Sequence, residues 1–115
     1  MTTQPTYRVV IDDLRTHPLP ARHLRTLNQA LAWLSEHESC DELWLDHDLG
    51  LGADGQPETI RPFVRALEEA IFDGTAPAIG MIYVHTANPV GASFMTSSRL
   101  LSQHCRVIAV TFPTR

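Results

Sequence analysis

The amino-acid sequence predicts a three-layer α/β domain, in which a mostly parallel sheet of about five strands has helices on both faces. Two kinds of segment support this fold class. Short apolar segments rich in β-branched residues alternate along the chain with longer segments whose apolar residues recur at helical spacing. Such alternation is typical of parallel strands joined by right-handed crossovers. Residues 1–115 are expected to form one domain, because this length and a hydrophobic content of 43% suffice for a buried core.

The N-terminal segment predicts two strands separated by a loop. Residues 1–6 are expected to form a loose tail, and residues 7–11 are rich in β-branched residues, which predicts a buried strand. Residues 14–22 contain two prolines and lack a helical period, so we expect a loop there. A short second strand is predicted at residues 23–26.

The first helix is predicted from a capping signal. Thr26 and Gln29 match a capping box, and the helix should end near His37. Its expected buried face is Leu27, Ala30, Leu31 and Leu34. Residues 42–46 predict a buried strand. The glycine-rich residues 50–57 beyond it predict a flexible loop, which suits a lid and an ordinary exposed loop equally well.

Capping signals also delimit the second helix. Thr59 is expected to cap it, with Pro62 in the first turn and Gly74 just beyond the end. Its expected buried face is Phe63, Val64, Leu67, Ala70 and Ile71. Residues 79–84 then predict another strand.

The third helix is predicted from an Asn-Pro pair. Asn88 suits the N-cap and Pro89 the first helical position. One side of this helix is expected to carry Val90, Phe94 and Leu101. Residues 106–111 predict the last strand.

Composition excludes several classes of function. No apolar run approaches the roughly 20 residues that a membrane span needs, and no signal peptide is evident, so a cytoplasmic protein is expected. The nine basic residues are all arginines and the net charge is −4, which argues against an extended nucleic-acid surface, although binding of a nucleic-acid terminus stays open. Cys40 and Cys105 are expected to be small buried hydrophobes. Four histidines are expected at the surface: His17, His23, His37 and His104.

Acids and histidines follow three of the predicted strands. They are Asp12 and Asp13 after the first strand, Asp46, His47 and Asp48 at the end of the strand at residues 42–46, and His85 and Thr86 after the strand at residues 79–84. The carboxyl ends of parallel strands lie at one edge of a sheet, so these side chains are expected to converge. Crowded carboxylates need protons, cations or hydrogen bonds, which indicates a functional site.

This arrangement resembles the response-regulator receiver domain, which has two acids after its first strand, an Asp after a central strand and a Thr after the next. Receiver domains bind Mg²⁺ through such acids and accept a phosphoryl group on the central Asp, which corresponds here to Asp46. A receiver also has a Lys after its last strand. This sequence contains no lysine and has Val110-Thr111-Phe112-Pro113 at that place, so ordinary phosphorelay is not expected.

The sequence more closely resembles the cyclic-phosphate processing receiver domains over residues 7–110. Three motifs carry this resemblance: Asp12-Asp13-Leu14-Arg15, Leu45-Asp46-His47-Asp48-Leu49-Gly50 and His85-Thr86-Ala87-Asn88-Pro89-Val90-Gly91. The Arg25-Thr26 pair before the first helix is also similar. The resemblance implies a receiver-like, flavodoxin-like fold and a role in acting on cyclic phosphates.

If the protein hydrolyses a cyclic phosphodiester, each of these residues has an expected role. His47 and His85 are candidate acid and base, together with Asp46 as a catalytic carboxylate. Phosphate oxygens are expected to bind Arg15, Arg25, Thr86 and the helix start at Asn88.

Two arrangements of the carboxylates stay open. Asp12, Asp13, Asp46 and Asp48 would hold one Mg²⁺ or Mn²⁺ ion, or else they would orient the histidines and neutralise the arginines without a metal. The expected function is a phosphoesterase that acts on a small or terminal cyclic phosphate. The alternative is a non-catalytic, receiver-derived module that binds a phosphorylated ligand or a protein.

Overall fold

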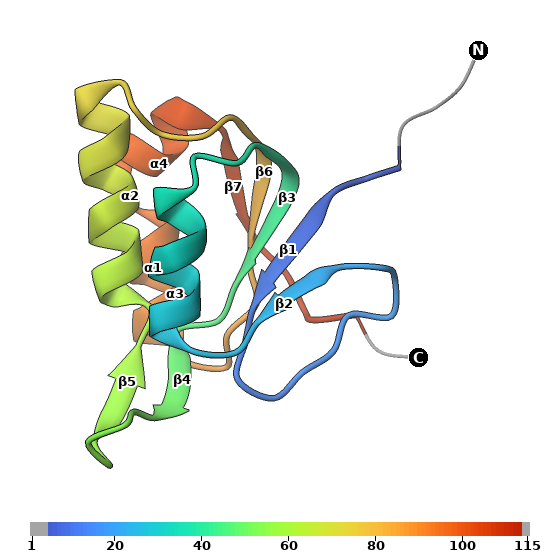
Figure 1. Ribbon diagram of the computed structural model, residues 1–115, viewed down its shortest axis with the longest axis vertical. Coiled ribbons are helices and arrows are strands. Elements are labelled where there is room, and N and C mark those ends of the chain that lie inside the picture. The colour runs from blue at the N-terminus through green and yellow to red at the C-terminus, as the bar shows by residue number, and fades with distance from the viewer. Residues whose placement is uncertain (1–4, 114–115) are drawn as a thin grey trace.

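The computed structural model describes residues 5–113 and contains a five-stranded parallel sheet. Its strands are β1 (Arg8–Ile11), β2 (Arg22–Leu24), β3 (Cys40–Leu45), β6 (Ile79–Val84) and β7 (Arg106–Ala109). They lie in the order β2-β1-β3-β6-β7, with every neighbouring pair parallel (Figure 1). This arrangement confirms the predicted flavodoxin-like sheet, and most strand ends differ from the predicted ones by one or two residues.

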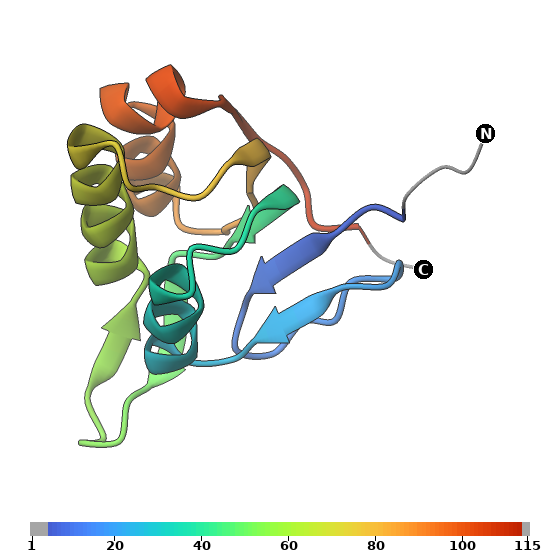
Figure 2. The same cartoon turned by 45° about the horizontal axis from the view of Figure 1, so that its top comes forward.

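Four helices pack against this sheet: α1 (Leu27–Ser35), α2 (Arg61–Asp73), α3 (Pro89–Thr96) and α4 (Arg99–His104). All four lie on the same face (Figures 1 and 2). The prediction of helices on both faces, and therefore of three layers, is wrong for residues 5–113. The connection from β1 to β2 is a loop, and the three connections that contain helices all advance in one direction across the sheet. Right-handed crossovers that advance in one direction place their helices on one face.

The two faces of the sheet are buried in different ways. Alternate strand residues such as Val9, Leu43 and Ile82 form the main core with the helices. The opposite face has a smaller core around Val10, Trp44 and Phe112, in which Trp44 stacks on Tyr83 with ring centroids 4.3 Å apart. The chain after β7 thus covers part of the face that has no helix.

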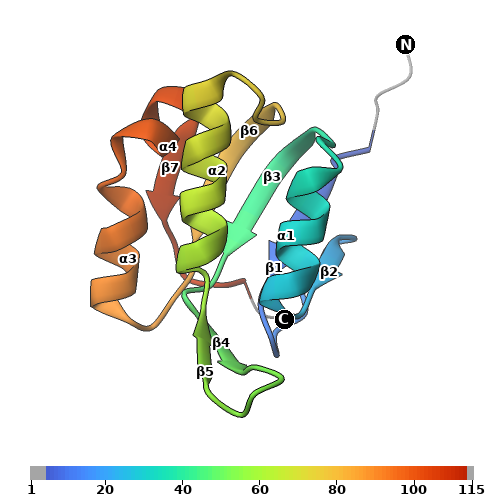
Figure 3. The same cartoon turned by 60° about the vertical axis from the view of Figure 1, so that its left-hand side comes forward.

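Residues 50–57 were predicted to be a loop, but both ends of this segment are strands in the structure. They belong largely to a β-hairpin of β4 (Asp48–Leu51) and β5 (Pro57–Thr59), which projects beyond the carboxyl edge of the main sheet (Figure 3). Its turn is closed by the Gly55 amide, which donates to the Gly52 carbonyl at 2.9 Å. Gly55 has a φ of 77°, so one of the glycines that suggested flexibility instead permits a tight turn.

The helix boundaries follow the predicted caps in part. Thr26 caps α1 as predicted, and α1 ends at Ser35. Gly74 adopts the left-handed conformation after α2, as predicted. Ile60 occupies the N-cap of α2, while the Thr59 hydroxyl accepts from the Arg61 amide at 3.3 Å.

The single third helix of the prediction is two helices in the structure. Asn88 caps α3 as predicted, but Ser98 begins the separate helix α4. Val90 is 69% exposed, so it does not share a buried side with Leu101, and Met95 is the buried large residue of α3. The break at Ser98 changes the helical phase, which a single apolar period cannot describe. None of the helices within residues 5–113 has the length and apolar character that a membrane crossing requires.

Candidate active site at the carboxyl edge of the sheet

Three predicted site residues form a compact cluster. Asp12 follows β1, Asp46 follows β3 and His85 follows β6, so three adjacent strands deliver them to one edge of the sheet. Each offers one potential ligand atom, and these atoms all lie within 4.8 Å of one another. Asp12 and His85 are each only 1% exposed, whereas Asp46 is half-buried. The predicted convergence of strand ends is therefore present for these three side chains.

Asp12 and His85 form a buried pair. Asp12 Oδ2 lies 3.1 Å from His85 Nε2, and Asp12 Oδ1 accepts the amides of Leu14 at 2.9 Å and Arg15 at 2.8 Å. Burial alone would raise the pKa of Asp12, but the hydrogen bonds from His85 and the two amides outweigh it and hold the pKa below its ordinary value. Asp12 is consequently an ionised carboxylate that fixes the orientation of the imidazole.

Asp46 has the opposite electrostatic character. Burial, followed by the negative charge of Asp12, raises its pKa above the ordinary value, while a hydrogen bond from the Thr86 hydroxyl and the proximity of His85 partly compensate. The two carboxyl groups of the cluster thus differ in proton affinity, and Asp46 is the stronger base.

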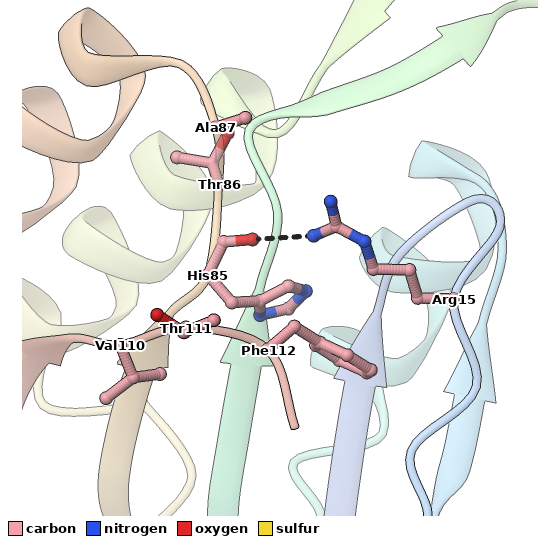
Figure 4. Close-up of a pocket in the computed structure, with 7 residues that line it drawn as sticks. All are labelled: Arg15, His85, Thr86, Ala87, Val110, Thr111 and Phe112. Atoms are coloured by element: carbon pink, nitrogen blue, oxygen red, sulfur yellow. Dashed lines mark hydrogen bonds between the residues drawn. The ribbon is translucent and has the colours of Figure 1, made fainter. Parts of the chain in front are cut away.

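An open hollow of about 390 Å³ lies beside this cluster. Its walls are Arg15, His85, Thr86, Ala87, Val110, Thr111 and Phe112 (Figure 4). The Arg15 guanidinium donates to the His85 carbonyl at 3.2 Å and lies 5.7 Å from the centre of the Phe112 ring. The His85 ring also packs against Phe112, with centroids 4.7 Å apart, and its Nδ1 is buried with no hydrogen-bond partner among residues 5–113.

Arg25 contacts the loop that carries Arg15. Its guanidinium donates to the carbonyls of Asp12 and Arg15 and to the Thr16 hydroxyl, the last at 2.9 Å. These contacts use both terminal nitrogens of Arg25. Its visible role is to shape the β1–β2 loop, whereas Arg15 presents its side chain to the hollow.

A second group of predicted residues lies apart from the cluster. His47 is 4% exposed, and its Nδ1 lies 2.9 Å from Asp48 Oδ1. Asn88 caps α3 and donates through its side chain to Asp48 Oδ2 at 3.4 Å. His47 packs against Gly91 and Phe94 of α3, so it shares none of the ring contacts of His85.

Asp13 lies beside the hairpin. A Cβ added at Gly50 would be 2.8 Å from Asp13 Oδ2, which shows how closely the hairpin backbone approaches this carboxylate. Asp13 and Asp48, two of the four predicted metal ligands, therefore lie outside the three-residue cluster.

Two residues near these sites were not singled out from the sequence. Phe112 forms a wall of the hollow, at the place where a receiver domain has its Lys. Its position after the last strand was visible, but an aromatic residue there gave no chemical signal. Arg61 donates from Nε to His47 Nε2 at 3.0 Å, and no pattern in the sequence linked these two residues.

An open parallel sheet that brings two acids and a threonine to its carboxyl edge defines a receiver-type α/β domain. The chain belongs to the cyclic-phosphate processing receiver domain family, whose model matches residues 7–99. The matched segment contains the whole acid–histidine cluster and ends before β7 and Phe112. No curated protein and no solved structure matches the chain.

Proposed function

We propose that this protein is a phosphoesterase that opens a small or terminal cyclic phosphate by adding water. One observation carries the proposal: the Asp12–Asp46–His85 cluster adjoins a hollow into which Arg15 projects. Membership in a family named for cyclic-phosphate processing supports the choice of substrate. A cyclic phosphate is a compact anion, and a hollow with one arginine and two threonines suits such a ligand.

Arg15 is the residue that we assign to the phosphate. One terminal nitrogen binds the His85 carbonyl, which holds the guanidinium beside the hollow and leaves its other terminal nitrogen for a ligand. The Asp12 carboxylate accepts the Arg15 amide, so the backbone that carries this side chain is fixed by the cluster itself. Thr86 lines the same hollow.

Asp46 and His85 are the residues that we assign to proton transfer. The water oxygen forms a bond to phosphorus while one ring P–O bond breaks. Asp46 takes the proton of the water, because its raised pKa makes it a stronger base than an ordinary Asp. His85 gives the leaving oxygen a proton from Nδ1, the ring nitrogen that Asp12 does not hold. Proton exchange with solvent then returns both side chains to their starting states.

The same three side chains also fit a divalent metal ion. Two carboxylates and an imidazole within 4.8 Å of one another suit Mn²⁺ better than Mg²⁺, which prefers oxygen ligands only. An ion held by Asp12, Asp46 and His85 would polarise a phosphoryl oxygen and lower the pKa of a bound water.

The test is a hydrolysis assay with 2′,3′-cyclic nucleotides, both free and at the end of a short RNA, in EDTA, Mg²⁺ or Mn²⁺. We expect turnover of at least one substrate, a KM about tenfold higher in Arg15→Gln, and a kcat reduced at least about 100-fold in Asp46→Asn. The exposed Asp73 provides a matched control, because Asp73→Asn should leave both constants unchanged. Absence of turnover across all substrates and ions would overturn the proposal.

One observation favours the alternative, a non-catalytic module that binds a phosphorylated ligand. His85 Nδ1 is enclosed, so the imidazole presents little surface to the hollow. Calorimetry with a 2′,3′-cyclic nucleotide distinguishes the two functions: binding that depends on Arg15 and yields no product selects the module.

A further inference from the structure

Two arginines of α2 flank one aromatic ring of α3. Arg61 is the first residue of α2, and Arg65 follows one turn later. The guanidinium carbon of Arg61 lies 4.2 Å from the centre of the Phe94 ring, and that of Arg65 lies 5.8 Å from it. Both cations therefore gather at the same ring, on the side of the molecule where α2 and α3 meet.

The Arg61 side chain is held by a buried histidine. Its Nε donates to His47 Nε2 at 3.0 Å, so that nitrogen of His47 is unprotonated and its Nδ1–H donates to Asp48 Oδ1 at 2.9 Å. His47 is only 4% exposed, so its ring is a fixed support. The two terminal nitrogens of Arg61 have no acceptor within residues 5–113, and they remain available to a ligand.

The positive charge at this place has no direct ion-pair partner within the described residues. Neither Arg61 nor Arg65 forms an ion pair within the described residues, whereas Arg8 and Arg22 both do. Like charges four residues apart on a helix repel each other. Arg61 is also the first residue of α2, which has no acid in its first turn. The positive charge of Arg61 therefore lies at the positive end of the helix dipole, which is unfavourable. A bound anion would relieve all of these repulsions.

An open hollow of about 480 Å³ lies in front of Arg61. Its other walls are Pro89, Val90, Ser93, Phe94 and Ser97. None of these residues lines the hollow beside Arg15, so the two sites are separate. Val90 is 69% exposed at its rim, which leaves the apolar wall open to a ligand.

We propose that Arg61 and Arg65 form a second site, which binds a tetrahedral oxyanion such as a phosphate group. A carboxylate has two oxygens and is satisfied by one guanidinium fork, whereas a phosphate offers enough oxygens for both arginines. The ligand is thus a phosphate group whose neighbouring atoms contact Phe94 and Val90. This site does not depend on the hydrolysis proposed above.

The test uses inorganic phosphate as the probe and Arg15→Gln as the background, so that the hollow beside His85 contributes little binding. Nitrogen-15 NMR should show the Nε–H signals of Arg61 and Arg65 shifting together to saturation with phosphate. Acetate at equal ionic strength should shift them far less. Adding Arg61→Gln or Arg65→Gln should weaken phosphate binding about tenfold, whereas Arg106→Gln, an exposed arginine of β7, should leave it unchanged.

Three results would overturn this second site. They are signals of Arg61 and Arg65 that move no more than that of Arg106, equal shifts with acetate, and an unchanged phosphate affinity in Arg61→Gln.

Discussion

Gly91 lies against the ring of His47, and this contact leaves no room for a side chain. A Cβ at residue 91 would lie 2.6 Å from the Cβ of His47 and would overlap the ring. We predict that Gly91→Ala lowers the free energy of unfolding by about 1–3 kcal/mol through overpacking. Alanine favours a helix over glycine by only about 1 kcal/mol, so the overlap decides the sign.

Chemical denaturation of Gly91→Ala checks this prediction, with the same substitution in a His47→Gly background as the control. Removing the whole side chain at residue 47, including its Cβ, should remove most of the loss. An equal loss in both backgrounds would contradict the assigned contact.

Glu42 is a second residue whose contacts predict a measurable effect. It accepts from the buried Arg8 at 2.7 Å and from the Trp44 indole at 2.9 Å. Burial raises its pKa, but these hydrogen bonds outweigh burial and hold the pKa below its ordinary value of 4.5. A lowered folded-state pKa means that ionised Glu42 stabilises the protein above about pH 4.5, and that this stability is lost as the pH falls through the folded pKa.

We predict that Glu42→Gln lowers the free energy of unfolding by about 1–3 kcal/mol at pH 7, because it leaves the charge of Arg8 poorly matched. The difference from wild type should shrink as the pH falls below 4.5. Thermal melts across pH check this, with the exposed Glu69→Gln as control. A difference that is constant with pH would contradict the role of Glu42.

For single residues, the sequence predicted which ones follow the strands, but it did not predict where every side chain points. His47 was grouped with His85 because both follow strands. His47 lies between two aspartates and instead packs against Phe94 of α3, where its Nε2 accepts a hydrogen bond from Arg61. His17 was expected at the surface but is 7% exposed, since it packs against Trp44 with ring centroids 4.8 Å apart. These orientations depend on contacts between distant segments, which a local pattern does not contain.

Ser98 separates two helices that the sequence pattern merged into one. Its hydroxyl accepts from the Leu101 amide at 3.2 Å and donates to Glu68 of α2 at 2.6 Å. We predict that Ser98→Ala lowers the free energy of unfolding by about 1–2 kcal/mol, because it removes a helix cap and a tertiary hydrogen bond. Denaturant unfolding measures this loss, and the exposed Ser102→Ala serves as control. Equal stability of Ser98→Ala and wild type would contradict the cap.

The strands of the main sheet and most helix caps were predictable from the sequence, but the order of the strands in the sheet was not. Each strand of the main sheet and the caps at Thr26, Gly74 and Asn88 followed from local sequence. The face on which each helix lies depends on the direction of its crossover, and therefore on strand order. That order is set by long-range packing. The same reason explains the hairpin, because glycines predict a turn without predicting that its flanks will pair.

The whole molecule should respond to a divalent ion if its central cluster binds one. Binding stabilises the folded state by about 2.7 kcal/mol when the ion is at one hundred times its dissociation constant. We predict that Mn²⁺ raises the melting temperature of wild type. Asp46→Asn should be more stable than wild type without metal, because it removes a half-buried charge beside Asp12, and it should respond less to Mn²⁺. Melting curves of both proteins that ignore Mn²⁺ would exclude the metal arrangement.

The sequence predicted the position of the candidate site better than it predicted which residues form that site. The edge of the sheet was predicted correctly, because parallel strands share one edge. Of the residues placed there, Asp12, Asp46 and His85 come together, while Asp13 and Asp48 lie by the hairpin and by His47. Phe112 joins the site from beyond the last strand, a contribution that only the folded chain reveals.

Phosphorus-31 NMR in oxygen-18-labelled water tests the central claim most directly, with a 2′,3′-cyclic nucleotide, Mn²⁺ and stoichiometric protein. We predict that wild type converts the cyclic phosphate signal to that of a monoester carrying one labelled oxygen. Asp46→Asn should slow this conversion at least about 100-fold, and Asp73→Asn should match wild type. A cyclic phosphate that persists unchanged, or one that Asp46→Asn opens as fast as wild type, would contradict hydrolysis at the Asp12–Asp46–His85 cluster.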